Sequence, residues 1–300
     1  RRLECRDFVN IIYVFFTQVF AHLCVASCMP YARLGGGIHL VTLQIANRMA
    51  GSLRKTRLWT LPCCQLSESI NHLVLGYNHS FNQHTRVKLE SYYQQVSGIP
   101  VLPNSFFSLA NFGSDFTFPR VDSLQNDGTG KNIGVELTLE RNFHKGYYFL
   151  FSGSLYDSKY LGGNGVEYNT AFSGNYAANI LGGAEFNLSK KVVLQIDAKI
   201  TYAGGKRYIP IDLAKSQLAG KAVFDESNIY HERFHDYFRA DLKAGIRINS
   251  KKITQEISFN VQNILDTKNV FQQVYDNVNK DVKTEYQLGF FPVGSYKIMF

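Results

Sequence analysis

Residues His231-Glu-Arg-Phe-His235 have the spacing of a zinc-peptidase motif, in which two histidines bind the metal and the glutamate is the general base. That chemistry needs both histidines on one face of a helix and a further ligand. Here the motif ends a long loop and runs directly into an alternating segment from Asp236. The favoured interpretation is therefore a solvated loop segment.

No other group of residues predicts catalysis or a cofactor. The glycine pairs at 162–163 and 204–205 are not followed by a helix, so we interpret them as turn glycines rather than phosphate cradles. Asp157-Ser158 and the scattered histidines form no nucleophile–base arrangement. The five cysteines all lie within residues 1–66 and have no metal-ligand spacing. We therefore expect no catalytic residue, no metal, no cofactor and no enzyme activity.

The positive charge of the chain is concentrated at its N-terminal end. Residues 1–66 hold eight Lys or Arg against two acidic residues, whereas residues 67–300 hold 24 basic and 22 acidic residues. The net charge of +8 therefore does not indicate nucleic-acid binding.

From about residue 70, the elements that position any site are alternating segments, in which apolar and polar residues follow a period of two. Segment 191–203 is the clearest example, because Leu194, Ile196 and Ile200 alternate with charged or amide side chains. Such a strand has one face toward water and one toward an oily phase. Nine segments have this pattern: 70–81, 85–96, 130–141, 146–157, 172–186, 191–203, 235–248, 253–264 and 284–300.

The polar residues on the lumen face of these strands have two favoured interpretations, ion pairs across the wall of a barrel or contacts to a plug inside it; a role in ligand binding is the less favoured one. The residues concerned are Glu136, Glu140, Gln195, Asp197, Lys199, Arg239, Asp241, Lys243, Arg247 and Glu256.

The connections between the segments alternate between short and long. Tight turns are predicted at 82–84, 142–145, 187–190 and 249–252, and long loops at 97–129, 158–171, 204–234 and 265–283. This alternation is typical of outer-membrane barrels, which have short periplasmic turns and long extracellular loops. An odd number of strands is unusual for such barrels, so we expect the chain to be the C-terminal part of a larger one.

The last 17 residues, from Thr284 to Phe300, predict a single long strand that closes the barrel. Tyr296, Ile298 and Phe300 fall on its apolar face, with Phe300 as the free C-terminus. We interpret these three residues as the signal for the barrel-assembly machinery.

Residues 67–300 resemble the C-terminal barrel of TonB-dependent receptors, in particular the Bacteroidota type with a carboxypeptidase-regulatory-like N-terminal domain. The resemblance implies an all-β fold, an antiparallel transmembrane β-barrel present in part, with about nine C-terminal strands of a 22-strand barrel. The motifs that carry it are His72–Tyr77, Lys88–Tyr93, Gly134–Glu140, Gly204–Asp212, Asp236–Leu242, Val261–Ile264 with Asn269–Phe271, and Tyr286–Pro292.

The resemblance also implies a location and partners. The protein is expected in the outer membrane of a Gram-negative bacterium, in contact with membrane lipid, as a receptor that imports an unknown extracellular ligand. The TonB complex would act through an N-terminal part that contains a plug and a TonB box, neither of which the resemblance places in this chain. The alternatives are a barrel that does not transport, such as an adhesin or a scaffold, and a soluble β-sandwich.

Residues 1–66 form an atypical N-terminal segment in which no barrel-type alternation is predicted. The largely apolar run from Phe8 to Met29 allows three interpretations: a transmembrane helix, a signal peptide, or non-native sequence upstream of a partial gene. The abrupt change in cysteine, charge and tryptophan usage near residue 67 favours the third.

The loops at 97–129 and 204–234 are the candidate sites of extracellular ligand capture, because loops on a rigid scaffold carry recognition. Within them, the candidate ligand residues are Phe106, Phe107, Phe112, Lys206, Arg207 and Tyr208.

Overall fold

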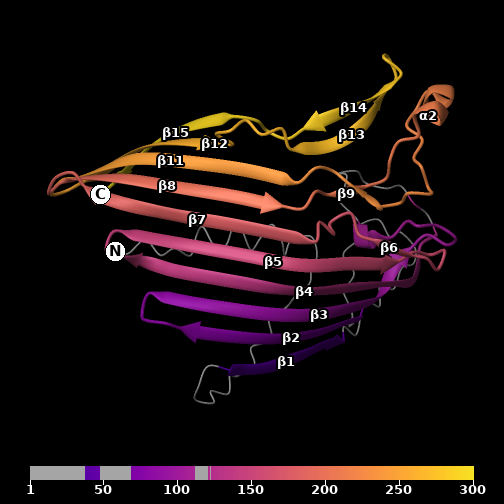
Figure 1. Cartoon of the computed structure of the whole chain (residues 1–300), viewed down its shortest axis with the longest axis horizontal. Helices are drawn as coiled ribbons and strands as arrows, with labels where there is room; N and C mark the ends of the chain where they lie inside the picture. Colours follow the sequence, from indigo (N-terminus) through magenta and orange to yellow (C-terminus); the bar gives the residue numbers. More distant parts are fainter. Residues whose placement is uncertain (1–37, 48–68, 112–120, 122) are drawn as a thin grey trace, which may run out of the picture.

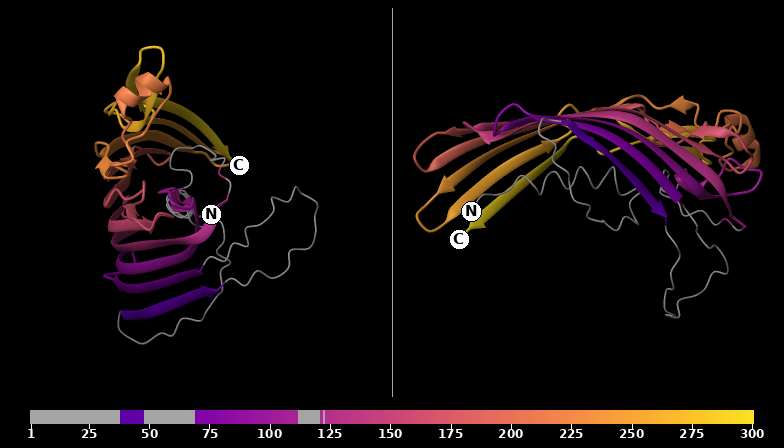
Figure 2. Two further views of the ribbon diagram at one scale, coloured as in Figure 1. Left: turned by 90° about the vertical axis from the view of Figure 1, so that its right-hand side faces the viewer. Right: turned by 90° about the horizontal axis from the view of Figure 1, so that it is seen from below.

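The computed structural model describes residues 38–47, 69–111, 121 and 123–300 (Figure 1). Its main feature is one antiparallel sheet in the order β1-β2-β3-β4-β5-β7-β8-β11-β12-β15, with the short β6 paired to β5. The sheet curves into an open trough (Figure 2). Its strands are β1 (Ile38–Asn47), β2 (Ser69–Ser80), β3 (Thr85–Val101), β4 (Gln125–His144), β5 (Tyr147–Leu161), β6 (Glu167–Asn169), β7 (Tyr176–Asn187), β8 (Val192–Ala203), β11 (Tyr237–Asn249), β12 (Thr254–Gln262) and β15 (Phe291–Met299).

Apolar side chains cover one face of this sheet from β2 to β15. Register aligns them across neighbouring strands: Ile246 of β11 lies opposite Leu194 of β8 and Ile257 of β12, and Ile257 lies opposite Tyr296 of β15. This face is exposed. Its exposed members include Leu73, Leu75, Tyr77, Leu89, Val135, Leu137, Ile180, Ile196, Ile200, Leu242, Ile246, Ile257, Phe259, Tyr296 and Ile298.

The opposite face carries ion pairs between strands, as one of the two interpretations of its charged residues predicted. Arg247 Nη2 lies 2.8 Å from Glu185 Oε2, and Lys243 Nζ lies 3.7 Å from Glu256 Oε1. Gln195 Nε2 donates to the other oxygen of Glu185 at 2.9 Å. Because these charges are paired, they need less compensation from solvent.

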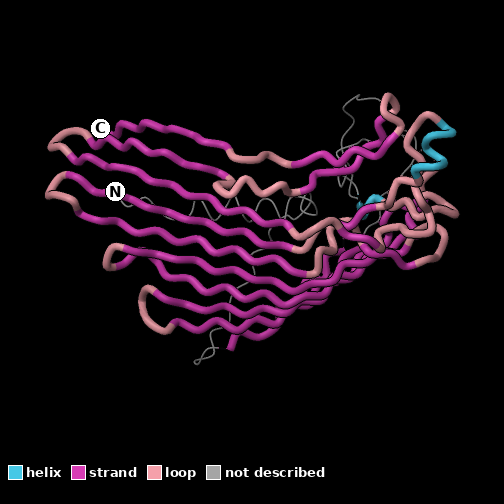
Figure 3. The backbone as a smooth tube through the Cα atoms, turned by 45° about the horizontal axis from the view of Figure 1, so that its top comes forward, coloured by secondary structure: helices cyan, strands magenta, loops and turns pink. Residues whose placement is uncertain are grey.

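The two ends of the trough differ, as the alternation of short and long connections predicted (Figure 3). Tight turns at 81–84, 145–146, 188–191 and 250–253 lie at one end. The long connections at the other end contain further short elements, which the sequence did not predict. These are η1 (Leu109–Asn111), β9 (Arg207–Tyr208), α2 (Leu213–Ala219), β10 (Glu232–Arg233), β13 (Val270–Asp276) and β14 (Asp281–Tyr286).

The small hydrophobic core of the described residues lies at the loop end rather than within the wall. It is formed by Val96, Ile99, Ala110 and Tyr160, of which Tyr160 is only 1% exposed. No helix in the described part of the chain is long and apolar enough to cross a membrane.

Two sequence predictions about strands were wrong. Residues 38–47, within the segment where no barrel strand was predicted, form β1 and pair with β2 from Ile38↔Tyr77 to Asn47↔Ser69. The pairing adds a strand to the nine that were predicted from residue 70. Backbone pairing to an already formed edge explains this strand, because it does not require an alternating sequence.

The second error concerns the last 17 residues, which do not form one strand. β14 ends at Tyr286 and pairs with β13, whereas β15 begins at Phe291 and pairs with β12. Between them, the Phe290 amide donates to Asp266 Oδ1 at 2.9 Å. A Cβ at Gly289 would lie 2.5 Å from the same oxygen, so a larger residue there would displace the Asp266 carboxylate. The Asp266 carboxylate thus holds the chain out of the ladder.

Candidate functional site

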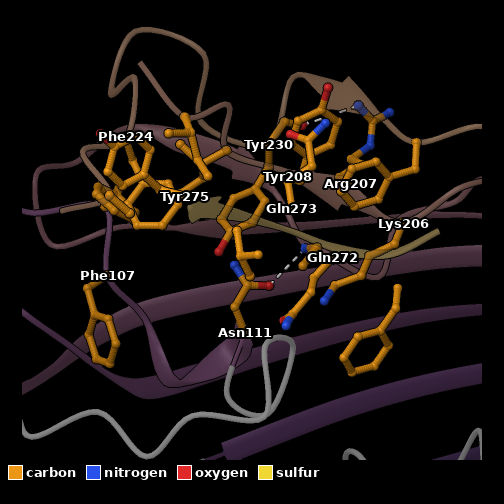
Figure 4. A pocket seen from close by; sticks show the side chains of 18 of the residues that line it. Phe107, Asn111, Lys206, Arg207, Tyr208, Phe224, Tyr230, Gln272, Gln273 and Tyr275 are labelled. Carbon is orange, nitrogen blue, oxygen red and sulfur yellow. Dashed lines mark hydrogen bonds between the residues drawn. The ribbon is translucent and has the colours of Figure 1, made fainter. Parts of the chain in front are cut away.

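A cavity of about 590 Å³ lies at the loop end of the trough (Figure 4). Three segments far apart in sequence form most of its lining: the loop after β3 with η1, the 204–234 connection, and strand β13. Tyr160 of β5 and Ala171 complete it. Its walls are mainly aromatic. The aromatic lining residues are Phe106, Phe107, Tyr160, Tyr208, Phe224, Tyr230, Phe234, Phe271 and Tyr275.

The polar lining residues are amides and cations. Asn111, Gln272 and Gln273 contribute amides, and Lys206 and Arg207 contribute positive charge. No carboxylate lines the cavity among the residues that the structure describes. An apolar cavity with a few placed polar groups is the usual form of a small-ligand site.

Arg207 holds three segments of the loop end together. Its Nε donates to the Ser173 carbonyl oxygen at 2.9 Å, and its Nη1 donates to the His231 carbonyl oxygen at 2.9 Å. Its Nη2 donates to Asn175 Oδ1 at 3.2 Å. Burial, followed by the nearby charge of Arg233, lowers the pKa of Arg207. The guanidinium is therefore engaged in building the cavity wall.

A stacked pair of rings separates the main cavity from a smaller one of about 240 Å³. Tyr208 and Phe234 lie with ring centroids 4.1 Å apart and planes 1° apart, and both residues line both cavities. The Tyr208 hydroxyl donates to Glu232 Oε2 at 2.9 Å, which fixes the ring. Burial, and then the hydrogen bond to Glu232, raises the pKa of Tyr208.

The floor of the cavity joins the loop after β3 to the end of β5. The Tyr160 hydroxyl donates to the Phe106 carbonyl oxygen at 2.9 Å. Asn111 Oδ1 accepts from the Ala171 amide at 3.0 Å. These bonds connect the loop to the hydrophobic core beneath it, so the floor is a fixed part of the site.

Two buried asparagines position the β13–β14 hairpin, which forms the remaining wall. Asn263 is 1% exposed, and its side chain accepts from the Thr267 amide at 3.0 Å and donates to the Thr267 carbonyl oxygen at 2.9 Å. Its backbone is left-handed, with φ of 49°, and its amide donates to Asp241 Oδ1 at 2.8 Å. Asn269 exchanges two hydrogen bonds of 2.9 Å with the backbone of Phe238. The hairpin is therefore anchored to β11.

The structure brings together most of the candidate ligand residues. Five of the six line the main cavity: Phe106, Phe107, Lys206, Arg207 and Tyr208. Phe112 lies outside the described residues. Their role in ligand binding stays a prediction.

Sequence reasoning missed the contribution of β13 and of the aromatic residues Phe224, Tyr230 and Phe234. Asn263 and Asn269 were a signal for the hairpin, because isolated asparagines near a strand end often fix turns.

The zinc-peptidase spacing at 231–235 does not form a metal site. Glu232 and Arg233 are extended in β10 and pair with β9, whereas the motif requires a helix. The described residues contain no group of three or more metal-binding side chains. Glu232 instead accepts the hydrogen bond from Tyr208.

The three residues interpreted as an assembly signal lie at the turn end of the sheet. Tyr296 and Ile298 belong to β15 and are exposed, and Phe300 is 99% exposed. The Tyr296 hydroxyl donates to Gln255 Oε1 at 2.9 Å.

Comparison with known proteins places the fold. No protein-family model and no curated protein matches the chain. Among solved structures, it is similar to the ferric yersiniabactin uptake receptor FyuA from Yersinia pestis, with a TM-score of 0.50 and 16% identity over 78% of this chain and 30% of that one. It is also similar to the ferric-catecholate import receptor Fiu from K12 E. coli, with a TM-score of 0.48 and 12% identity over 77% of this chain and 28% of that one.

The chain thus spans less than a third of the length of either receptor. At these identities the similarity concerns the fold, and the Bacteroidota type stays a prediction. The order of strands, the alternation of turns and loops, and this structural similarity agree with one another. The described strands have the fold of part of a TonB-dependent receptor barrel.

Proposed function

We propose that this chain is part of an outer-membrane receptor that captures a ligand at the loop-end cavity and imports it with energy from the TonB complex. The exposed apolar face is the observation that carries the proposal. It extends from Leu73 on β2 to Ile298 on β15, and a soluble protein rarely exposes an apolar surface of this extent. Membrane lipid is the partner that covers such a face of a barrel.

The cavity supports the receptor part of the proposal. It lies at the end of the long connections, which in outer-membrane barrels is the extracellular end. Its aromatic walls and few polar groups suit the capture of a ligand, as described above. The complete protein would supply the plug and the contact with the TonB complex.

The opposite end of the sheet supports a proposal about assembly. Tyr296, Ile298 and Phe300 lie at the turn end, and we assign them to recognition by the barrel-assembly machinery. The division of the chain changes slightly: β1 belongs with the barrel part, although it lies within residues 1–66.

Uptake by cells would test the proposal. Cells with the complete gene, cells that lack it and cells without TonB function would receive a mixture of peptides, oligosaccharides and ferric chelates. We expect the first strain alone to deplete one class of compound from the medium. Equal depletion by all three strains would contradict transport. Recovery of the protein in the outer membrane without TonB-linked depletion would support an adhesin or a scaffold instead.

A further inference from the structure

We propose that the ligand of the loop-end cavity is an extended peptide, which binds as an additional strand along the free edge of β13. The inference rests on the proposed function, because it names the class of ligand for the same cavity. Three observations carry it: an unpaired strand edge in the cavity wall, two buried polar groups without a partner, and aromatic walls that suit side chains.

The first observation is the edge of β13. Within the described residues, β13 pairs only with β14, in a sheet of two strands. In an antiparallel pair, alternate residues direct their N–H and C=O groups away from the partner. Gln272, Gln273, Val274 and Tyr275 of this strand line the cavity, so their edge forms part of its wall. A peptide that adds a strand to an exposed edge is an established mode of recognition.

The length of the edge sets the length of the ligand. β13 has seven residues. At about 3.3 Å per residue, this edge is about 23 Å long, so an extended pentapeptide of about 17 Å fits along it. The anchoring of Asn263 and Asn269 keeps the edge in place before the ligand arrives, which reduces the entropy lost on binding.

The second observation is that two buried polar groups of the cavity lack a partner among the described residues. They are Asn111 Nδ2 and the Tyr275 hydroxyl. Asn111 is 9% exposed, and Figure 4 shows its side chain directed into the cavity. The Tyr160 hydroxyl, which donates to the Phe106 carbonyl oxygen, interacts with the Asn111 side chain, but Asn111 Nδ2 itself has no hydrogen-bond partner.

A buried donor without an acceptor is unfavourable, so such groups are usually paired with protein, ordered water or a bound ligand. The carbonyl oxygens of a peptide would accept from Asn111 Nδ2 and from the Tyr275 hydroxyl.

The third observation is the composition of the remaining wall. Aromatic rings of Phe107, Phe224 and Tyr230 also line the cavity, and Figure 4 shows Phe224 beside Tyr275 of β13. They offer apolar surface to alternate side chains of a bound strand. Because Lys206 and Arg207 contribute positive charge and no described lining residue is acidic, we expect the peptide to carry no lysine or arginine.

The experiment uses the complete receptor in detergent and a fluorescent, acetylated and amidated pentapeptide of alternating serine and phenylalanine. Two further peptides carry N-methyl groups, either on the odd or on the even residues. An extended strand directs alternate N–H groups to opposite edges. One of the two N-methylated peptides should therefore lose at least tenfold in affinity, and the other should bind almost as well as the parent peptide. Equal affinities of the two would contradict strand addition.

Variants of the receptor test the two polar groups. Asn111→Asp keeps the acceptor for the Ala171 amide and removes the donor, and Tyr275→Phe removes the hydroxyl. Each should raise the Kd of the parent peptide about tenfold. Tyr147→Phe, at the turn end of β5, is the matched control and should leave the Kd unchanged. Unchanged affinity in both cavity variants would overturn the inference.

A maltooligosaccharide and a ferric catecholate, tested in parallel, separate the two proposals. One outcome is that the peptide does not bind, whereas one of these two compounds binds and loses affinity in Tyr275→Phe. In that case the peptide inference fails and the proposed receptor function stands. If no probe binds and no TonB-linked uptake is found, both proposals fail.

Discussion

The wall and the loop end of this molecule are built on different physical principles. In the wall, long strands repeat one pattern, with apolar side chains on one face and paired charges such as Arg247–Glu185 on the other. At the loop end, single residues such as Asn263 and Arg207 make several specific hydrogen bonds each. The stability of the wall therefore depends on the medium around it and on the hydrogen bonds between its strands. The stability of the loop end depends on individual side chains.

This difference agrees with the proposed division of labour. A wall that must face lipid can tolerate many apolar sequences, because each position needs only to be apolar on one face. A ligand cavity must hold defined groups in defined places, which requires buried polar residues with fixed partners. The small core around Tyr160 lies where that precision is needed.

The largest expected effect is a loss of stability of the wall. Ile196→Arg places a charge on the apolar face, and for a lipid-facing position near the bilayer midplane this costs about 2–4 kcal/mol. Urea unfolding of the protein in lipid vesicles should show this decrease in the free energy of unfolding. Gln195→Lys, on the neighbouring residue of the opposite face, is the control, because the new ammonium group can pair with Glu185. An equal loss in both variants would contradict the assignment of the two faces.

The next largest effect is a loss of stability at the loop end that leaves the wall unchanged. Asn263→Ala removes the side chain that binds both backbone groups of Thr267 in a buried position, and we expect a local loss of about 2–3 kcal/mol. Hydrogen exchange should accelerate in β13 and β14 and stay unchanged in β8. Asn279→Ala, at the exposed tip of the same hairpin, should have little effect. Uniform acceleration across the sheet would show that the two regions are not independent.

A smaller effect tests whether Arg207 acts as a fork or only as a charge. Arg207→Lys keeps the charge and loses the planar set of donors to Ser173, His231 and Asn175, so we expect the cavity wall to lose about 1–2 kcal/mol. Limited proteolysis of the 204–234 connection measures this change. Lys221→Gln, an exposed position in the same connection, controls for the effect of altering a charged residue. An unchanged rate of proteolysis in Arg207→Lys would mean that a positive charge alone is enough to hold the cavity wall.

The smallest effect concerns pH at helix α2. The Lys215 amide donates to Asp212 Oδ1 at 3.0 Å, and this bond, followed by the interaction with the Lys215 side chain, lowers the pKa of Asp212. A lowered pKa in the folded state means that the cap stabilises the helix above the unfolded pKa of about 4 and is lost as the pH falls through the folded value. Amide exchange at Lys215 should therefore increase in acid.

Asp212→Asn supplies the control for the pH experiment. An asparagine caps a helix without titrating. Exchange at Lys215 should then show no additional acid dependence. The same dependence in both proteins would assign it to another group, such as Asp225, whose pKa is also lowered by its hydrogen bonds with Ser227 and Asn228.

The regular part of the fold could be predicted from sequence, and the irregular part could not. Eight of the nine alternating segments each correspond to one strand of the sheet, and the ninth contains β15, because side-chain alternation is a local property of each strand. β1 was missed because it is formed by pairing to the edge of β2. The break at Gly289 was missed because it depends on Asp266, more than 20 positions earlier in the chain.

For the candidate site, the sequence located the two loops but not their third partner. Phe106 and Tyr208 were found because aromatic and basic residues gather in the long connections. The contribution of Gln273 and Tyr275 depends on how the hairpin is anchored to β11 through Asn269. No local sequence pattern predicts that the hairpin lies close to the two loops in space.

The sequence by itself determined the two faces of the wall and the alternation of short and long connections. Both follow from the period of two and from turn residues, which act over a few neighbouring positions. Only the tertiary structure decided that Phe106, Tyr208 and Tyr275 line one cavity, and that β13 presents a free edge to it. The physical reason is that the cavity is made by hydrogen bonds between segments far apart in the chain, which no local preference encodes.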